Sequence, residues 1–494
     1  MNYTSTRDNS LSVSSSVAIS QGISKEGGLF VPCEFPKFSL DKIKEMVSMS
    51  YIERAKLVLR EYLTDFSEEE LDYCVNGAYK ASKFSSEKVA PVVNIGGNEN
   101  ILELWHGPTC AFKDMALQLL PYLMTVSAKK AVNGKEIVIL VATSGDTGKA
   151  ALEGFKNVEN TKILVFYPVD GVSKMQKLQM ATQEGDNVAV CAINGNFDDA
   201  QSAVKSIFTN NEIKAKLSEK NMMFSSANSI NWGRLVPQIV YYFSAYCDLA
   251  EQGRINVGDM INVVVPTGNF GNILAAYYAK RMGLPIKKLI CASNSNNVLT
   301  DFLSTGEYNK IREFYTTTSP SMDILISSNL ERLLYHISGN NDKLISELMN
   351  SLQAEGRYSI DDNMQKSIKE DFAAGFADEN SVKETIKEHD YLFDTHTSVA
   401  VKVYEDYVKK TGDDITTVID STASPYKFPK SVYTAKLGTD TFNGDEFDAL
   451  VELNALTGVD IPEPIKALKD KPVRFTEVCN KEDMAEMVFK LLKL

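Results

Sequence analysis

A lysine within residues 104–117 (LWHGPTCAFKDMAL) has the surroundings of a reactive amine. Lys113 stands at the expected junction of a loop and a helix, behind Gly107, Pro108 and a run of small or apolar residues. Packing beside Phe112 would take the amine partly out of water, which favours the neutral, nucleophilic form that builds a Schiff base with an aldehyde. The alternative is structural, because a lysine at a helix start also pairs with a neighbouring carboxylate, here Asp114.

Two glycine-rich loops each follow a predicted buried strand and open a predicted helix. The first comes after the apolar run 137–142 and consists of Ser144, Gly145, Asp146, Thr147 and Gly148. The second comes after 263–266 and consists of Gly268, Asn269, Phe270, Gly271 and Asn272. Backbone N–H groups at a helix start point at an anion, and the helix dipole adds roughly half a positive charge there. The loops predict a phosphate site, although such turns also serve purely structural roles.

Composition indicates a globular enzyme and excludes several classes of partner. The chain has 494 residues, 44% of them hydrophobic and 24% charged, with a formal net charge of −13. A broad basic face for nucleic acid is therefore not expected. No apolar run approaches membrane-spanning length and the amino terminus lacks a signal segment, so we expect no membrane and a cytoplasmic location.

Cysteine and histidine usage predicts neither a disulfide framework nor a metal site. The seven cysteines are an odd number without CxxC spacing, which indicates reduced thiols. The four histidines show no metal-ligand spacing. We read Cys110, close to Lys113, as a packing residue.

The order of predicted elements indicates an α/β fold. Strands near 137–142, 163–167, 188–193, 222–226, 261–266, 288–292 and 416–420 alternate with helical stretches. Such alternation is typical of open, mostly parallel, twisted sheets covered by helices. Two such sheets with a cleft between them would place both glycine loops at the carboxyl ends of strands. Pro121 is expected to stop or kink the helix that follows Lys113.

We expect three units along the chain. They are an amino-terminal α/β extension at 1–90 with helices at 40–49, 51–63 and 68–81, a domain at 91–215 with Lys113 and the first glycine loop, and a larger domain at 216–494 with the second glycine loop. The larger domain includes a charged stretch near 340–390 that is helical in pattern, and we interpret this stretch as surface.

An ordered series of motifs across nearly the whole chain resembles the threonine synthase family, whose members use pyridoxal phosphate (PLP) on fold type II. The motifs are YTSTR at 3–7, GGLFVP at 27–32, HGPT and AFKDMALQ around Lys113, SGDTG at 144–148, NGNFDD at 194–199, NSIN at 228–231, PTGNFGN at 266–272, SPSMDILISSN at 319–329 and DTHT at 394–397. The series is far more specific than any one of its members.

The resemblance implies which residues hold the cofactor. Lys113 would be the amine that binds PLP, and Gly268, Asn269, Phe270, Gly271 and Asn272 would hold its phosphate. Residues 418–428 align with the family's STAHPAKF pattern and place Thr422 against the pyridine nitrogen. Asp146 would face the cofactor O3′ or its own loop rather than an anionic substrate. Read without the family, Thr422 is only a residue that follows a strand.

The resemblance also implies the reaction, in which O-phospho-L-homoserine and water give L-threonine and phosphate, the work of a carbon–oxygen lyase acting on phosphates. Lys113 would move protons at the substrate carbons. The substrate carboxylate would meet Ser144, Gly145 and Thr147. The substrate phosphate would meet Asn228, Ser229, Asn231 and Arg234, joined by Lys174, because a buried dianion needs charge-assisted donors. Asp394 and His396 would support the site.

Several alternatives remain open from the sequence. The chain has Ser424 where the family has His, and Tyr426 where the family has a small residue. A non-catalytic relative would keep the fold yet release no phosphate. A β-replacement or dehydratase enzyme would keep Lys113 but not need residues 228–234, whereas an ATPase would need GxxxxGK[ST] spacing, which is absent. Arg234 has a structural alternative as an ion-paired helix residue. We expect a monomer or homodimer.

Overall fold

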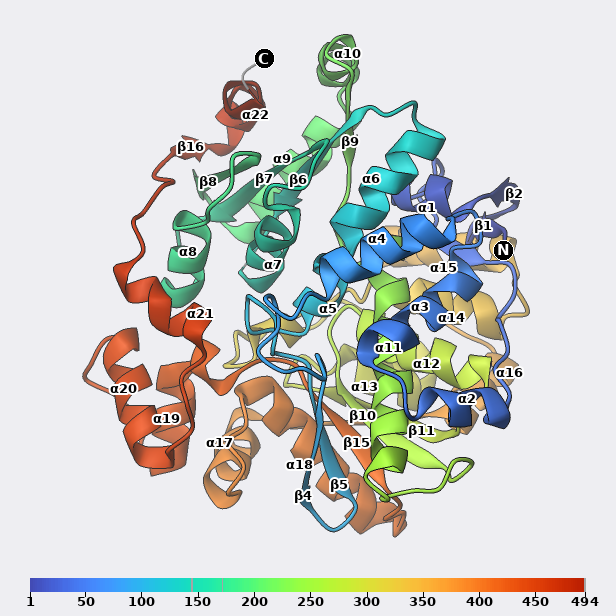
Figure 1. Ribbon diagram of the computed structural model, residues 1–494, viewed down its shortest axis with the longest axis vertical. Coiled ribbons are helices and arrows are strands. Elements are labelled where there is room, and N and C mark those ends of the chain that lie inside the picture. Colours follow the sequence, from blue (N-terminus) through green and yellow to red (C-terminus); the bar gives the residue numbers. More distant parts are fainter. Residues whose placement is uncertain (144, 171, 493–494) are drawn as a thin grey trace.

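Two sheets form the centre of the molecule (Figure 1). The computed structural model describes residues 1–143, 145–170 and 172–492. The smaller sheet has the order β16-β8-β7-β6-β9, and all of its pairings are parallel. Its strands are β6 (Glu136–Ala142), β7 (Thr161–Pro168), β8 (Val188–Asn194), β9 (Met222–Ser225) and β16 (Val478–Asn480).

Helices cover both faces of this five-stranded sheet. The helices α6 (Leu120–Ala131) and α7 (Asp146–Phe155) contact one face, and α9 (Phe197–Thr209) and α22 (Met484–Leu492) contact the other. The helices α8 (Lys174–Ala181) and α10 (Asn211–Glu219) complete this half of the molecule. Because both faces are covered, strands such as β6 and β7 are apolar at nearly every position rather than at every second one.

The larger sheet has six strands in the order β14-β11-β10-β15-β5-β4, and only the pairing of β4 with β5 is antiparallel. Its strands are β4 (Val92–Gly96), β5 (Glu99–Glu103), β10 (Ile261–Pro266), β11 (Ile286–Ser293), β14 (Phe372–Phe376) and β15 (Thr417–Ser421). The helix α18 (Thr395–Thr411) packs along one face. The other face meets α12 (Gly271–Met282) and the long, buried helix α11 (Trp232–Glu251).

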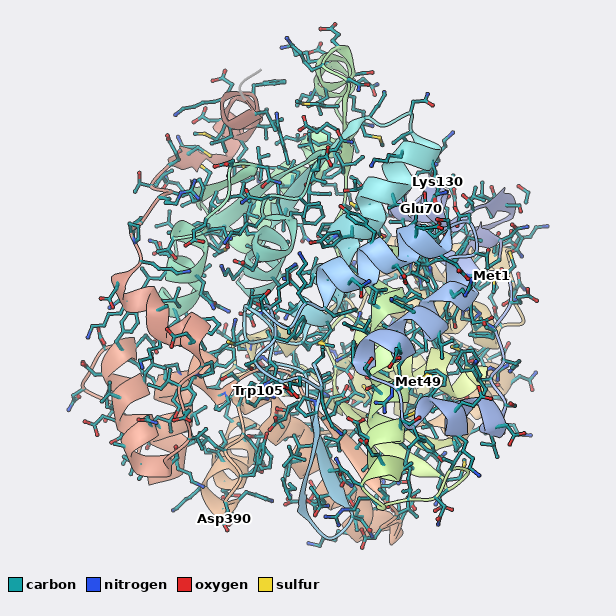
Figure 2. The ribbon with its side chains drawn as sticks, in the orientation of Figure 1. Met1, Met49, Glu70, Trp105, Lys130 and Asp390 are labelled. Carbon is teal, nitrogen blue, oxygen red and sulfur yellow. The ribbon has the colours of Figure 1, made fainter. Side chains whose placement is uncertain are left out.

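The amino-terminal unit packs against helices of both halves, α6 of the smaller half and α11 of the larger. It contains an antiparallel sheet of β1 (Tyr3–Ser5), β2 (Asp8–Val13) and β3 (Phe30–Pro32), followed by α1 (Ser15–Gln21), α2 (Leu40–Met46), α3 (Tyr51–Tyr62) and α4 (Glu68–Ala78). Arg54 of α3 forms a buried ion pair with Asp248 of α11 at 2.6 Å. At the surface, Glu70 of α4 meets Lys130 of α6 at 2.9 Å (Figure 2).

The remaining elements lie along the second half of the chain. They are α13 (Val298–Thr305), the hairpin of β12 (Glu307–Asn309) and β13 (Arg357–Ser359), η1 (Pro320–Met322), α14 (Leu330–Ile337), α15 (Asp342–Glu355), α16 (Asp362–Asp371), α17 (Glu379–Glu388), η2 (Pro425–Lys427), α19 (Pro429–Leu437), α20 (Glu446–Thr457), α21 (Glu463–Lys466), η3 (Ala467–Asp470) and η4 (Lys481–Asp483). No helix in the described ranges is both long and apolar enough to cross a bilayer.

The predicted fold class is confirmed, and so are the three predicted amino-terminal helices, which appear as α2, α3 and α4. The division of the chain at 90/91 and 215/216 stays a prediction. The two sheets do not follow this division, because each contains strands from both sides of 215/216. Strands β4 and β5 belong to the larger sheet, whereas β9 and β16 belong to the smaller one. Pairing between strands is nonlocal, so it does not follow a linear division of the chain.

The stretch at 340–390 is not purely helical, which corrects our expectation. It contains β13 and also β14, the edge strand of the larger sheet. Strand β14 is a run of only five residues between two charged helices, and so short a run is masked by the helical periodicity on either side.

The helix that carries Lys113 is short and is held by a close approach. Helix α5 (Lys113–Leu117) ends before α6, and Pro121 lies in the first turn of α6, where its missing N–H costs nothing. Gly154 of α7 packs directly on α5, and a Cβ at Gly154 would overlap the Leu117 carbonyl oxygen. The absence of a side chain at Gly154 thus lets α7 approach the lysine helix.

Replacement of Gly154 by alanine should force α5 and α7 apart. Because the overlapping atom is backbone, we expect Gly154→Ala to lower the free energy of unfolding by about 3 kcal/mol, measured by urea denaturation. Gly412→Ala is the matched control. Gly412 has φ +69° and nothing within 4 Å of its Cβ position, so it should cost only about 1 kcal/mol. Equal losses in both variants would contradict this account of the helix contact.

Candidate active site

The carboxyl ends of strands from both sheets open on one site. Strand β6 leads into the loop before α7, and β10 leads into the loop before α12. Strands β5 and β15 are adjacent, and the chains that leave them stay hydrogen-bonded: the Phe112 N–H donates to the Thr422 carbonyl at 2.8 Å and the Ser424 N–H to the Cys110 carbonyl at 3.0 Å. These bonds fix Lys113, one residue further on, beside Thr422.

Lys113 is a buried amine without a carboxylate partner in the described part of the chain. Its Nζ donates to Ser321 Oγ at 3.3 Å and lies 4.9 Å from the centre of the Phe112 ring. Burial lowers the pKa of Lys113 to about 8, with Asp146 opposing the shift and Arg234 and Lys427 adding to it. Asp114 instead accepts from the Thr109 N–H and hydroxyl, both at 2.8 Å. The structure therefore favours the reactive reading of Lys113 over a pair with Asp114.

A hydrogen-bonded chain supports the contact between Lys113 and Ser321. The Ser321 N–H donates to His396 Nε2 at 3.2 Å, and His396 Nδ1 lies 2.9 Å from Asp394 Oδ1. Because the carboxylate can only accept, Nδ1 carries the hydrogen and Nε2 is the acceptor. Asp394 also caps α18. The DTHT motif thus supports the site through Ser321, which agrees with the supporting role expected from the sequence.

The first glycine loop places a buried carboxylate, that of Asp146, near Lys113. Asp146 is buried and accepts from Lys427 Nζ at 3.0 Å and from Gln176 Nε2 at 3.1 Å. Burial by itself would raise the pKa of Asp146, but Lys427 and Lys113 hold it well below its usual range. A Cβ at Gly145, whose φ is +150°, would overlap the Gln176 amide. The side chain of Thr147 lies at the start of α7, and Ser144 lies outside the described residues.

The second glycine loop forms a cup of backbone donors. Among the described hydrogen bonds, none is donated to protein by the backbone N–H groups of residues 268–272, which precede and begin α12. Phe270 has φ +63°, a left-handed conformation that turns the chain into the helix. A Cβ at Gly268 would lie 2.6 Å from the Ser321 carbonyl oxygen, so only glycine fits there. These donors fit a phosphate group.

The two asparagine side chains of this loop differ in their availability. Asn269 is exposed, and its Oδ1 accepts from the Ser328 hydroxyl at 3.3 Å. Asn272 is buried. Its Nδ2 donates to the Pro266 carbonyl at 3.0 Å, and its Oδ1 accepts from the Ile273 N–H at 2.9 Å. The structure thus commits the Asn272 amide to shaping the loop, and a direct contact between Asn272 and phosphate stays a prediction.

The first turn of α11 brings a buried guanidinium to the site. Arg234 is 5% exposed, its Nη1 donates to the Ala227 carbonyl at 2.9 Å, and its buried Nε has no partner among the described residues. Burial lowers the pKa of Arg234 to about 10. No carboxylate in the described ranges pairs with Arg234, so the structural reading as an ion-paired helix residue is not what the structure shows. Its free donor suits an anionic ligand.

The neighbours of Arg234 have different surroundings. Asn228 is exposed, and the Ser229 hydroxyl lies 3.5 Å from that of Ser328, which joins this segment to Asn269. Asn231 caps α11 and donates to the Ile19 and Ser226 carbonyls at 3.0 and 2.9 Å. Its amide is therefore committed to holding the amino-terminal unit against this segment. Contacts of these residues with substrate stay a prediction.

Lys174 has a surface environment. It begins α8, its side chain is 55% exposed, and it forms an ion pair at 3.0 Å with Asp445 at the start of α20.

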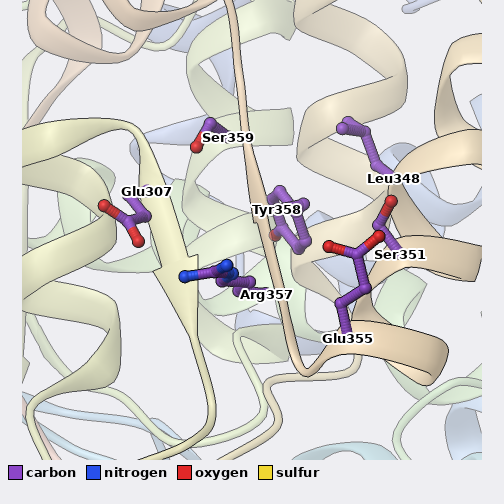
Figure 3. Close-up of a pocket in the computed structure, with 7 residues that line it drawn as sticks. All are labelled: Glu307, Leu348, Ser351, Glu355, Arg357, Tyr358 and Ser359. Atoms are coloured by element: carbon purple, nitrogen blue, oxygen red, sulfur yellow. The ribbon is translucent and has the colours of Figure 1, made fainter.

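A cavity of about 380 Å³ between the β12–β13 hairpin and α15 contains none of the predicted site residues (Figure 3). In the described ranges no three His, Cys, Asp or Glu side chains are arranged to hold a metal ion.

Sequence reasoning missed two residues of this site, Lys427 and Ser321. Both lie inside motifs quoted above, in the segments 418–428 and 319–329. A lysine flanked by Tyr426 and Phe428 is the kind of buried cation that signals a site, but the sequence did not reveal that its partner would be Asp146, some 280 residues earlier. The contact is made only when the two sheets come together.

The fold and this site define a pyridoxal-phosphate-dependent enzyme of fold type II. Residues 96–352 match the family model for pyridoxal-phosphate dependent enzymes, residues 2–79 match the threonine synthase N terminus, and residues 397–488 match the threonine synthase C-terminal region. The chain is 38% identical over 444 residues to threonine synthase from Pseudomonas aeruginosa, covering 89% of this chain and 91% of that protein. The chain belongs to the threonine synthase family.

Two further comparisons define the extent of the likeness. The crystal structure of PLP-bound threonine synthase from Brucella melitensis aligns with a TM-score of 0.88 at 36% identity, covering 100% of both chains. Threonine synthase-like 1 from Homo sapiens is 42% identical over 434 residues, covering 85% of this chain but 58% of that protein. The chain thus spans less than two thirds of the length of threonine synthase-like 1.

The cofactor is pyridoxal phosphate, and the residues present fit it. Lys113 supplies a buried amine with a lowered pKa, and residues 268–272 supply backbone donors for a phosphate. Thr422 is buried on the strand β15 side of the same site. We propose, as the sequence predicts, that the Thr422 hydroxyl meets the pyridine nitrogen and that the cup holds the phosphate.

The lowered pKa of Lys113 predicts how the protein takes up its cofactor. Only the neutral amine attacks the PLP aldehyde, so the rate of uptake by cofactor-stripped protein should rise with pH to a midpoint near 8. Stopped-flow measurement of the visible absorbance checks this expectation. Free Nα-acetyl-lysine is the control, with a midpoint near 10.4. A midpoint for the protein close to that of the control would contradict the desolvated environment of Lys113.

Proposed function

We propose that the protein is a threonine synthase, a lyase that converts O-phospho-L-homoserine and water to L-threonine and phosphate. The observation that carries the proposal is the unpaired, buried guanidinium of Arg234 in the same site as Lys113. The glycine cup accounts for one phosphate, that of the cofactor, and Arg234 provides a separate cationic donor for a second. A substrate that itself carries a phosphate fits this arrangement.

The chain's own residues divide the work. When bound, PLP draws electrons from the substrate and so makes protons on its carbons removable. Lys113 takes the proton from Cα and moves protons at Cα and Cβ, which an amine with a pKa near 8 does at neutral to mildly basic pH. Arg234 holds the phosphate that leaves Cγ. Gly145 and Thr147, together with Ser144, receive the carboxylate.

Thr422 suits this chemistry because its hydroxyl is neutral. Unlike a carboxylate, a hydroxyl does not hold a proton on the pyridine nitrogen, so charge is shared toward the β and γ carbons.

The seven cysteines are free thiols, which supports a reducing, cytoplasmic location. We propose a monomer or homodimer as the working assembly.

Removal of the amine should abolish the reaction. We expect Lys113→Ala to release no phosphate from O-phospho-L-homoserine while it still binds PLP weakly through the glycine cup, measured by a phosphate-release assay with homoserine and serine as control substrates. Threonine formation by this variant would overturn the assignment of Lys113. If the wild-type protein loaded with PLP releases no phosphate, then the chain is a non-catalytic or differently specific family member.

Removal of the guanidinium should weaken use of the phosphorylated substrate. We expect Arg234→Gln to lower kcat/KM roughly 100-fold, mainly through KM, because a buried donor to a dianion is lost. The matched control is Arg281→Gln, since Arg281 stacks over Phe35 at 5.4 Å on the far end of α12. Its kcat/KM should stay within about twofold of wild type. An unchanged kcat/KM in Arg234→Gln with full cofactor content would contradict a role in phosphate binding.

A further inference from the structure

A buried lysine that has no assigned role joins the two halves of the site. Lys427 is 4% exposed and follows β15 of the larger sheet. Its Nζ donates to Asp146 at 3.0 Å, to the Thr109 carbonyl at 2.9 Å and to Gln179 Oε1 at 3.3 Å. Asp146 and Gln179 belong to helices of the smaller half, whereas Thr109 belongs to the loop that carries Lys113. A single ammonium therefore ties three segments together across both sheets.

The charge of Asp146 makes this contact important for the site. A buried carboxylate beside the reacting amine would repel any anionic ligand and would favour the charged form of that amine. Lys427 and Gln176 together engage Asp146 Oδ1. The carboxylate therefore does not act as a free anion in the site, although it lies among groups that receive anions.

We propose that Lys427 is a positioning residue, whose ammonium pins and neutralises Asp146 so that the first glycine loop can face an anionic substrate beside Lys113. The inference rests on the proposed function only for the identity of that substrate. The effect on Lys113 follows from charges within the protein.

The charges around Lys113 fix the direction of the expected effect. Asp146 of α7 and Asp114 of α5 favour its charged form, whereas Arg234 of α11 and Lys427 disfavour it. His396, held by Asp394, reaches Lys113 only through Ser321. Loss of Lys427 removes one of the two cations and also leaves Asp146 without its partner. Both changes favour the protonated form, so they shift the titration in the same direction.

The test is a pH titration of the visible absorbance of the resting holoenzyme, which needs no substrate. The midpoint reports the pKa of the Lys113 nitrogen in its bond to the cofactor. In Lys427→Met this midpoint should move upward by about one pH unit, because the loss of a buried cation and the release of the Asp146 charge both stabilise the protonated form. Lys427→Arg, which keeps the charge, should stay close to wild type. The matched control is Lys436→Met, since Lys436 is half-buried on α19 and, within the described ranges, donates only to backbone carbonyls. Its midpoint should not move.

A second variant covers the case in which Lys427→Met fails to fold or to hold PLP. Asp146→Asn removes the carboxylate that opposes Lys427, so the midpoint of this variant should move downward. The double variant of Lys427→Met and Asp146→Asn should have a midpoint closer to that of wild type. A lowered Tm in Lys427→Met with an unchanged midpoint would overturn the proposal and leave Lys427 a purely structural residue. So would an upward or absent shift in Asp146→Asn. Because these readouts precede turnover, they remain decisive even if the protein released no phosphate.

Discussion

The burial of three cations, which have one ion-paired carboxylate between them in the described part of the chain, is the constraint on which the site depends. Lys113, Arg234 and Lys427 are all buried, and among the described residues Asp146 forms an ion pair with Lys427 only. Buried charge without a partner is costly, so a protein keeps it only where another group supplies the missing charge. Here the missing charge is anionic, and the phosphate of the cofactor and the substrate that we propose would supply it.

The rest of the fold holds these cations in place against their own repulsion. Arg332 of α14 links the amino-terminal unit to the site, because it donates to the Phe30 carbonyl at 2.9 Å and to the Ile230 carbonyl at 2.6 Å. Arg7 of the YTSTR motif is anchored on Glu331 at 2.7 Å. These bonds join the first 30 residues to the segment that ends in Arg234. The amino-terminal motif therefore helps to fix the backbone around the site.

The two departures from the family pattern have structural explanations. Ser424 is fully buried, and its hydroxyl accepts from the Tyr426 N–H at 3.3 Å, so it caps the turn that leads to Lys427. Tyr426 packs in the core of the larger half and its hydroxyl reaches the Val459 carbonyl. The turn is thus held by a serine cap and an aromatic anchor. Lys427 and Thr422 keep their positions in the site without an imidazole.

The sequence by itself determined the kinds of local structure and the chemistry available. Apolar runs followed by glycine loops identified β6 and β10, the spacing around Pro121 predicted the break between α5 and α6, and the motifs around Lys113 named the amine. Which strands are neighbours, and which charges meet, was decided only by the tertiary structure. The pairing of Lys427 with Asp146 and the contact of Ser321 with Lys113 join residues more than 200 positions apart. No local pattern encodes such contacts, because burial and partner charge arise only when the two sheets close on each other.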